Sequence, residues 1–151
     1  MESIAIIGAG LAGLSAARQL QVKGHHTYIF EKGKVAGGRL STQQEDWGEF
    51  DQGAQYFTAR HPEFIEQLGL WQHQGIVTQW KMQPARWQRG KLSPSADSQQ
   101  RWVGTPSMST LATNLARDLN ILYNCRVINM EFDHNQWWLF DMKGRHFGPF
   151  D

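Results

Sequence analysis

The chain has 151 residues and a formal charge of +1, with 15 Lys and Arg residues against 14 Asp and Glu residues. This length suits one domain that buries its own core, and the balance of charge argues against nucleic acid as the main partner. The longest apolar run is too short to span a bilayer, so no membrane segment is expected. The single cysteine, Cys125, cannot form an internal disulfide and fits a reducing compartment. Because the first residues lack the basic region of a signal peptide, we expect a cytoplasmic protein.

The first predicted unit is strand, turn, helix and strand over residues 3–31. An apolar run meets the sequence GAGLAG, a helical apolar pattern follows, and a second β-rich run ends at Glu31. This order is typical of a dinucleotide-binding fingerprint. Gly8 permits the tight turn, Gly10 lets a pyrophosphate approach the backbone, and Gly13 lets the helix pack on the strand. The helix N-terminus offers N–H groups to phosphates, and Glu31 can accept ribose hydroxyls. The alternative is a β-α-β unit with a Gly-rich turn and no ligand.

The next segment is predicted as a glycine-rich loop over residues 32–41 and then a cluster of acidic residues, which are Glu45, Asp46, Glu49 and Asp51. These acids lie without the His or Cys spacing of a metal site, so we interpret them as a solvated loop and expect no metal. A short helix follows, for which Pro62 suits the first turn and Gly69 the end.

Residues 71–103 change to β character. Alternating residues at 76–82, a strand at 86–92 that enters a Gly turn and another strand at 100–103 predict an antiparallel patch. We interpret residues 71–101 as an insertion into an α/β domain and the start of a substrate domain. Most of the seven tryptophans lie in this region or at 137–138, and we interpret them as packing residues in preference to substrate-stacking residues.

The last part of the chain begins with a predicted helix that carries Leu111, Leu115 and Leu119 on one face, capped by Ser107 or Ser109.

Extended segments follow this helix. They are an extended run at 121–128, a strand at 127–132, and a hairpin of 136–141 with 145–147 around a Lys143-Gly144 turn. Residues 148–151 carry no closing helix or strand in this interpretation. A doubly wound sheet normally continues further, so we expect a truncated chain.

A second glycine motif follows the fingerprint closely. In Gly37-Gly38-Arg39-Leu40-Ser41-Thr42, the paired glycines let the backbone pass a bulky planar cofactor, and Arg39 can pair with a phosphate. With DQGAQYF at 51–57 and WVGTPSMS at 102–109, this motif resembles the flavin-containing amine oxidase superfamily. More closely, the chain resembles the renalase-like FAD-dependent oxidoreductases of bacteria.

The resemblance implies a Rossmann-like FAD-binding domain with a parallel sheet, made of residues 1–70 and 102–151, with residues 71–101 inserted. It implies cofactor-binding roles for several residues. Those at the FAD pyrophosphate are Gly8, Gly10, Leu11, Ala12 and Gly13; at the adenosine ribose, Glu31 and Lys32; at phosphate, Gly38 and Arg39; near the flavin ring, Gly53, Ala54, Gln55 and Tyr56; and at the adenine, through its backbone, Val127. The alternatives are a surface role for Arg39, core or loop roles for Gln55 and Tyr56, and a core role for Val127. No catalytic residue is identified.

The resemblance implies an FAD-dependent oxidoreductase in which the flavin accepts a hydride from a reduced small molecule. A dihydronicotinamide-type substrate and dioxygen as the electron acceptor are expected from the renalase-like relatives. The alternatives are a flavin-containing amine oxidase, a dinucleotide-binding module without turnover, and an inert folding unit. Because the expected substrate domain is incomplete, we expect this chain alone to be inactive. The sequence leaves the oligomeric state open.

Overall fold

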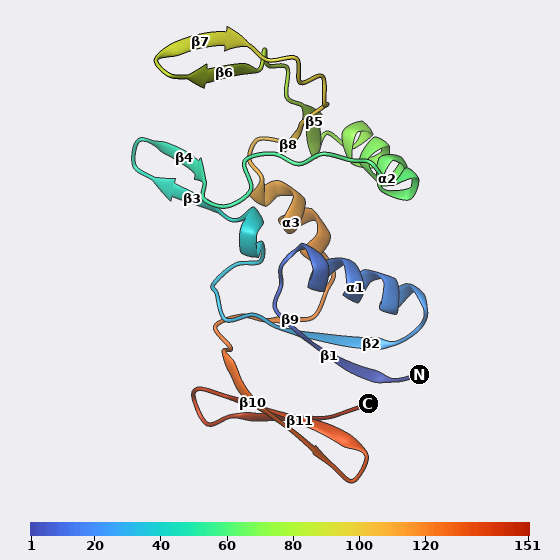
Figure 1. Cartoon of the computed structure of the whole chain (residues 1–151). Helices are drawn as coiled ribbons and strands as arrows, with labels where there is room; N and C mark the ends of the chain where they lie inside the picture. The colour runs from blue at the N-terminus through green and yellow to red at the C-terminus, as the bar shows by residue number, and fades with distance from the viewer.

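A computed structural model describes all 151 residues. Its centre is a parallel sheet of β1 (Ser3–Ile7), β2 (His26–Phe30) and β9 (Ile121–Leu122), in the order β1-β2-β9. Helix α1 (Leu11–Val22) joins β1 to β2, as parallel pairing requires, and lies on one face of the sheet (Figure 1). The predicted β-α-β unit is confirmed. Leu14 and Ala17 form the buried face of α1, and Gly24 follows the helix with φ of +85°.

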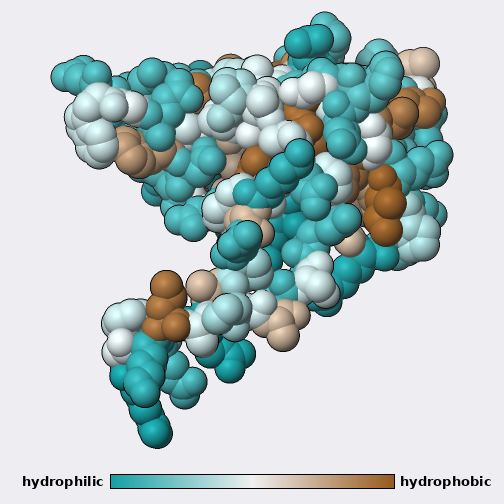
Figure 2. All heavy atoms as spheres, turned by 90° about the horizontal axis from the view of Figure 1, so that it is seen from above, coloured by the Kyte–Doolittle hydropathy of each residue, from teal (hydrophilic) through white to brown (hydrophobic).

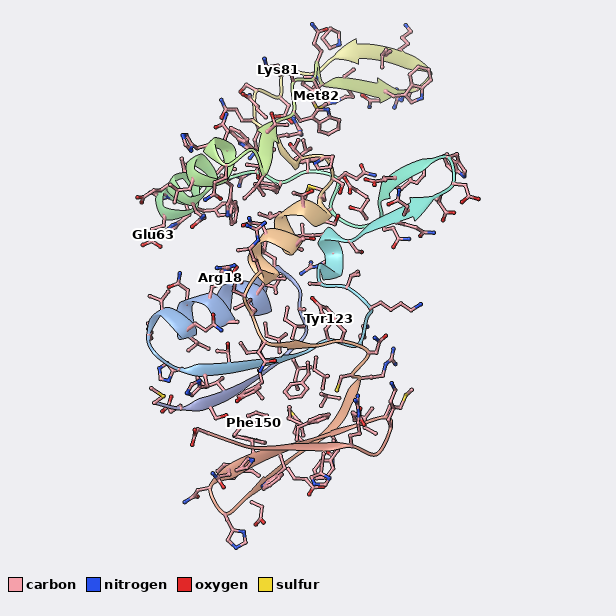
Figure 3. The ribbon with its side chains drawn as sticks, turned by 180° about the vertical axis from the view of Figure 1, so that it is seen from behind. Arg18, Glu63, Lys81, Met82, Tyr123 and Phe150 are labelled. Carbon is pink, nitrogen blue, oxygen red and sulfur yellow. The ribbon has the colours of Figure 1, made fainter.

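Helix α3 (Ser109–Ala116) packs beside α1 and contributes Leu111, Ala112 and Leu115 to the main core. The predicted cap and the last predicted helical turn are both wrong. No side chain of the helix's own segment caps α3, and the helix ends before Leu119. The side chain of Arg18 lies between α1 and α3 (Figure 3). It donates to the backbone carbonyls of Asn114, Leu115 and Arg117 at the C-terminal end of α3, where the helix itself supplies no donors.

The N-terminus of α3 is capped from outside the helix. Residues 42–51, interpreted above as a solvated loop, form a hairpin of β3 (Thr42–Glu45) and β4 (Gly48–Asp51). At its base, Asp51 Oδ1 accepts from Thr42 Oγ1 at 2.7 Å and from the Met108 N–H at 3.1 Å. Thr42 Oγ1 in turn accepts from the Ser109 N–H at 3.2 Å. Side chains distant in sequence therefore satisfy donors that a local Ser was expected to satisfy.

The middle of the chain forms one helix and two strand pairs. Helix α2 (Pro62–His73) runs past Gly69, the predicted end. The antiparallel prediction for this region is confirmed by two pairs, β5 (Val77–Gln79) with β8 (Trp102–Gly104) and β6 (Ala85–Gln88) with β7 (Lys91–Pro94). Hairpins β3–β4 and β6–β7 project to the same side of the body (Figure 1), and Figure 2 shows a narrow arm standing apart from a largely hydrophilic surface. None of the helices has the length and apolar character needed to cross a membrane.

An antiparallel sheet covers the face of the parallel sheet that lies away from α1 (Figure 1). Its strands are β10 (Val127–Asp133), β11 (Gln136–Asp141) and β12 (His146–Phe150). Phe30, Cys125, Leu139 and Phe150 form a second core between the layers. The predicted hairpin is confirmed, but the prediction of no strand at residues 148–151 is wrong. Residues 148–150 complete β12, and Asp151 exchanges hydrogen bonds with Ser3 of β1.

A buried carboxylate fixes the β11–β12 turn. Asp141 is 2% exposed; it accepts from the N–H groups of Lys143 and Arg145 and from the guanidinium of Arg145 at 2.6 and 2.8 Å. Burial opposes ionisation of this carboxyl, but the hydrogen bonds from Arg145 and Lys143 outweigh it and hold the pKa of Asp141 below its ordinary value. Burial raises the pKa of the neighbouring Cys125 thiol, which keeps it protonated.

We predict that Asp141 makes folding stability depend on acid pH. Since its pKa is lower in the folded state, its contribution is complete above the ordinary carboxyl pKa and is lost as pH falls through the folded value. Urea unfolding of wild type and Asp141→Asn should therefore show a stability gap at neutral pH that narrows on acidification. For the control Asp46→Asn, at an exposed position, the free energy of unfolding should depend on pH as it does in wild type. A gap that stays constant with pH would assign the effect to packing.

Candidate functional site

The glycine-rich loop leaves an open helix N-terminus at the carboxyl end of β1. Gly8 has φ of +99°, a conformation that side chains other than glycine rarely adopt. A Cβ on Gly13 would lie 2.1 Å from the Gly8 carbonyl oxygen, whereas a Cβ on Gly10 would meet nothing within 4 Å. No side chain caps α1, and Leu11 and Ala12 at its start are exposed. The first N–H groups of the helix thus face open space, as an anion-binding helix end requires.

Glu31 connects this loop to the segments beside it. The residue is 8% exposed; Oε2 accepts from the Ala9 N–H at 2.8 Å and Oε1 from the Gly33 N–H at 2.6 Å. Its backbone N–H donates to Leu122 and its carbonyl accepts from Cys125, each at 2.9 Å. The carboxylate predicted to meet a ribose therefore also fixes the loop around it. Each oxygen keeps a further acceptor position, because a carboxylate offers about four lone-pair sites.

The second glycine motif lies directly against the first. The Gly37 N–H donates to the Ala9 carbonyl at 2.9 Å, and Gly10 and Gly37 form a parallel bridge. A Cβ on Gly38 would lie 3.4 Å from the Gly10 Cα. The following 3-10 turn, η1 (Gly38–Leu40), presents Arg39 at the surface, where its guanidinium makes no hydrogen bond or ion pair within the chain. A cation without an internal partner thus stands beside an uncapped helix N-terminus.

The third motif extends the same surface. A Cβ on Gly53 would lie 2.3 Å from the Arg39 carbonyl oxygen, and the Ala54 N–H donates to that oxygen at 2.7 Å. Gln55 and Tyr56, which come next, are exposed. Backbone contacts therefore bring the glycine-rich loop, the second glycine motif and the segment 53–56 into one continuous region.

Two predicted residues lie at the edge of this region. Lys32 is exposed and follows Glu31. Val127 begins β10 and packs against the second core, two residues after Cys125, whose N–H donates to the Glu31 carbonyl. Sequence reasoning missed Gly33, where a Cβ would lie 3.1 Å from Glu31 Oε1. Its place in the glycine-rich loop after the fingerprint acid was the available signal.

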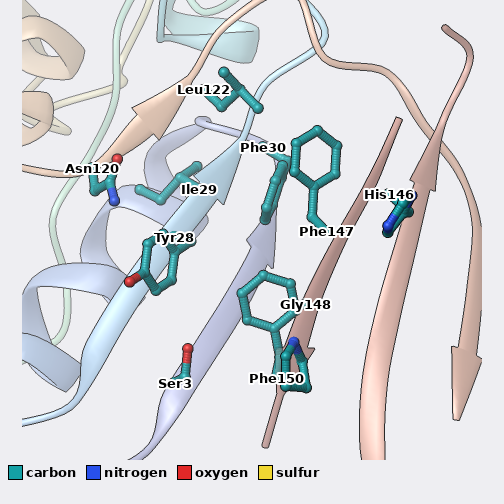
Figure 4. A pocket seen from close by; sticks show the side chains of 11 residues that line it. Ser3, Tyr28, Ile29, Phe30, Asn120, Leu122, His146, Phe147, Gly148 and Phe150 are labelled. Carbon is teal, nitrogen blue, oxygen red and sulfur yellow. The ribbon is translucent and has the colours of Figure 1, made fainter. Parts of the chain in front are cut away.

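A cavity of about 550 Å³ lies elsewhere, between the parallel sheet and β12 (Figure 4). Its walls are largely aromatic, formed by Tyr28, Phe30, Phe147 and Phe150 with His146 at one side. No residue of the glycine-bearing segments 8–13, 37–42 and 53–56 lines it. It is a gap between two sheet layers, and the glycine-rich region remains the candidate site.

Comparison with protein families finds a match to the NAD(P)-binding Rossmann-like domain over residues 6–68. This segment contains all three glycine-bearing motifs.

Curated relatives match part of the chain. A 4,4'-diapophytoene desaturase of Staphylococcus haemolyticus is 50% identical over 50 residues, which are 33% of this chain and 10% of the desaturase. A 1-hydroxycarotenoid 3,4-desaturase of Flavobacterium sp. is 43% identical over 61 residues, which are 40% of this chain and 12% of that enzyme. The similarity thus spans about a tenth of each relative.

Solved structures match nearly the whole chain. A protein assigned as an FAD-containing monooxygenase of Photorhabdus luminescens has a TM-score of 0.63 at 19% identity, over 97% of this chain and 37% of its own. Wild-type putrescine oxidase bound to putrescine has a TM-score of 0.71 at 12% identity, over 96% of this chain and 56% of its own. The predicted fold class, a Rossmann-like fold with a parallel sheet, is confirmed.

The space around Gly13 and Gly10 predicts that alanine at the two positions changes stability by different amounts. Gly13→Ala places a methyl group 2.1 Å from a backbone oxygen and should lower the free energy of unfolding by about 2 kcal/mol or more. Gly10→Ala has open space and φ of −81°, so its effect should stay below about 1 kcal/mol. Denaturant unfolding measures both. Equal losses in the two variants would contradict the close approach of α1 to β1.

Proposed function

We propose that this chain is the dinucleotide-binding part of an FAD-dependent oxidoreductase of the flavin-containing amine oxidase superfamily. One observation carries the proposal: two glycine motifs touch through their backbones beside an uncapped helix N-terminus, with Glu31 at the same edge. A plain NAD-binding unit needs only the first motif. The second motif and the segment 53–56 favour a longer cofactor, and the FAD-containing structural neighbour supports the same choice.

The residues present fit FAD. The space around Gly10 admits a diphosphate to the backbone, and the N–H groups at Leu11, Ala12 and Gly13 can donate to it. Arg39, which lacks an internal partner, can neutralise its charge, and Gly38 keeps the approach open. Glu31 and Lys32 would hold the adenosine ribose, and the backbone at Val127 would meet the adenine.

The other end of the cofactor would meet the segment that carries Gly53, Ala54, Gln55 and Tyr56. When bound, the flavin supplies hydride and electron transfer, while the protein orients it and excludes water. Residues 1–70 and 102–151 would form the FAD-binding domain, and residues 71–101 would be the start of the substrate domain.

For the reaction, we propose a renalase-like oxidase of the cytoplasm that accepts a hydride from a dihydronicotinamide-type small molecule and passes electrons to dioxygen. The motifs at 37–42, 51–57 and 102–109 support this subtype. An amine oxidase is the second candidate, and the likeness to putrescine oxidase favours it. A binding module without turnover is the third.

The cofactor proposal predicts that Gly10→Ala folds normally but binds FAD poorly. Its methyl group would occupy the space through which the diphosphate reaches the backbone, so the Kd for FAD should rise about tenfold or more. Flavin absorbance after reconstitution measures the loading. Gly69→Ala is the matched control, because its Cβ also meets nothing within 4 Å and it lies on α2, away from the motifs. Unchanged FAD affinity in Gly10→Ala would show that this loop is not part of the cofactor site. A protein that binds NAD and not FAD would contradict the assignment of FAD as the cofactor.

The substrate proposal is tested by anaerobic reduction. Dihydronicotinamides added to the FAD-loaded full-length protein should bleach the flavin absorbance, and readmitted dioxygen should restore it. Diamines such as putrescine should leave the absorbance unchanged. Bleaching by amines alone would establish the amine oxidase instead, and a flavin that neither class reduces would favour the binding module.

A further inference from the structure

Tyr56 lies where the proposed cofactor region meets the inserted segment. Its neighbour Phe57 forms a two-way bridge with Trp102 of β8, in which each N–H donates to the other residue's carbonyl at 2.9 Å. The Trp80 N–H donates to the Arg101 carbonyl at 2.8 Å. These backbone contacts bring the side chains of Tyr56, Trp80 and Arg101 together from three separate stretches of chain.

Arg101 holds one face of the Tyr56 ring. Its guanidinium carbon lies 5.1 Å from the ring centroid, within the range of a cation–π contact. The Arg101 side chain is 14% exposed, although most arginines of this chain lie at the surface. It is fixed by Asp97, whose Oδ2 lies 2.5 Å from Arg101 Nη2, and by the Gln99 carbonyl at 3.3 Å. The hydrogen bonds from the Gln99 N–H and from Arg101 hold the pKa of the Asp97 carboxyl below its ordinary value.

The rings of Tyr56 and Trp80 form an open corner. Their centroids are 5.9 Å apart and their planes are tilted by 45°, and the two residues keep 42% and 40% of their surface exposed. Neither residue belongs to the two hydrophobic cores, so both rings keep surface that a ligand can reach. Met82, 39% exposed, follows Trp80 two residues later.

The chemistry of this corner favours a neutral planar ring. The Arg101 guanidinium already covers one face of the Tyr56 ring, so that face is closed to a cation–π contact with an ammonium-bearing ligand. The guanidinium is paired with Asp97, so it offers no free charge to an anion. Offset or tilted aromatic surfaces remain as the available contact, and they suit a flat, uncharged ring.

We infer that Arg101 is a positioning residue that fixes Tyr56 against Trp80 as the wall on which a neutral planar substrate ring, such as a dihydronicotinamide, lies. The inference rests on the proposed function, which places the segment 53–56 near the flavin. Arg101 acts through Tyr56 and takes no part in hydride transfer. The inserted segment, by supplying Arg101, Asp97 and Trp80, thereby sets substrate preference for a site that the opening motifs build.

The first test replaces Arg101 in the FAD-loaded full-length protein. Arg101→Gln should raise KM for a dihydronicotinamide about three- to tenfold, with kcat and FAD loading near wild type, and Arg101→Lys should recover part of the loss because it keeps the cation. Arg86→Gln, at an exposed arginine of β6, is the matched control and should leave KM, kcat and FAD loading unchanged. A KM unchanged in Arg101→Gln would overturn the inference, as would a loss of FAD loading, which indicates a structural role.

A second measurement needs no turnover. The Tyr56–Trp80 pair should contribute a near-ultraviolet circular dichroism signal that Tyr56→Leu and Arg101→Gln remove alike and Arg86→Gln keeps. An Arg101→Gln spectrum identical to wild type would show that Arg101 does not position the ring. If dihydronicotinamides fail to reduce the wild-type flavin, the proposed substrate and the ligand assigned to this wall are both wrong, while the spectrum still decides the link between Arg101 and Tyr56.

Discussion

The glycine-rich end of this molecule depends on the carboxylate of Glu31. Four hydrogen bonds at this residue, two to side-chain oxygens and two along the backbone, tie together the turn after β1, the loop after β2 and the connection from β9 to β10. Three chain segments are thus fixed around one buried acid. A carboxylate in this position must be hydrogen-bonded to be stable, because an unpaired buried charge is costly. The requirement that keeps Glu31 satisfied also keeps the Ala9 and Gly33 N–H groups in a single arrangement, so the surface is organised before any ligand arrives.

Backbone contact, not side-chain contact, builds the region around Glu31. Gly13 touches Gly8 and Gly53 touches Arg39, each at a distance that leaves no room for a methyl group, and Gly38 lies in van der Waals contact with Gly10. Close packing of this kind turns peptide groups toward solvent as donors and keeps side chains out of the space they face. The result suits a polyanion, which needs many N–H donors and few obstructions.

Local patterns predicted the β-α-β unit and the hairpin of 136–141 with 145–147, because each is encoded by consecutive residues, with glycines at the turns. They failed where the partner is distant in sequence. A Ser next to α3 looked like its cap, yet Asp51 and Thr42 fill that role from more than fifty residues away. The hairpin 42–51 was read as a loop because its polar sequence lacks an apolar face, and its strands pair mainly through the backbone. The local pattern also missed the last strand residues, since Phe150 pairs with Trp137 of β11 and Asp151 with Ser3, at the opposite end of the chain.

The same limit applies to the candidate site. The motifs predicted which residues gather at the glycine-rich end, since each carries its own steric signature. Arg101 and Trp80 carry none: one is a single arginine in a polar stretch, the other a single tryptophan among seven. Their significance appears only when the Phe57–Trp102 bridge sets the two segments side by side. A cofactor cradle made of backbone leaves a recurrent sequence pattern, because only glycine fits. A wall made of side chains can be built from many residue types at many positions, so it follows from the fold and not from a motif.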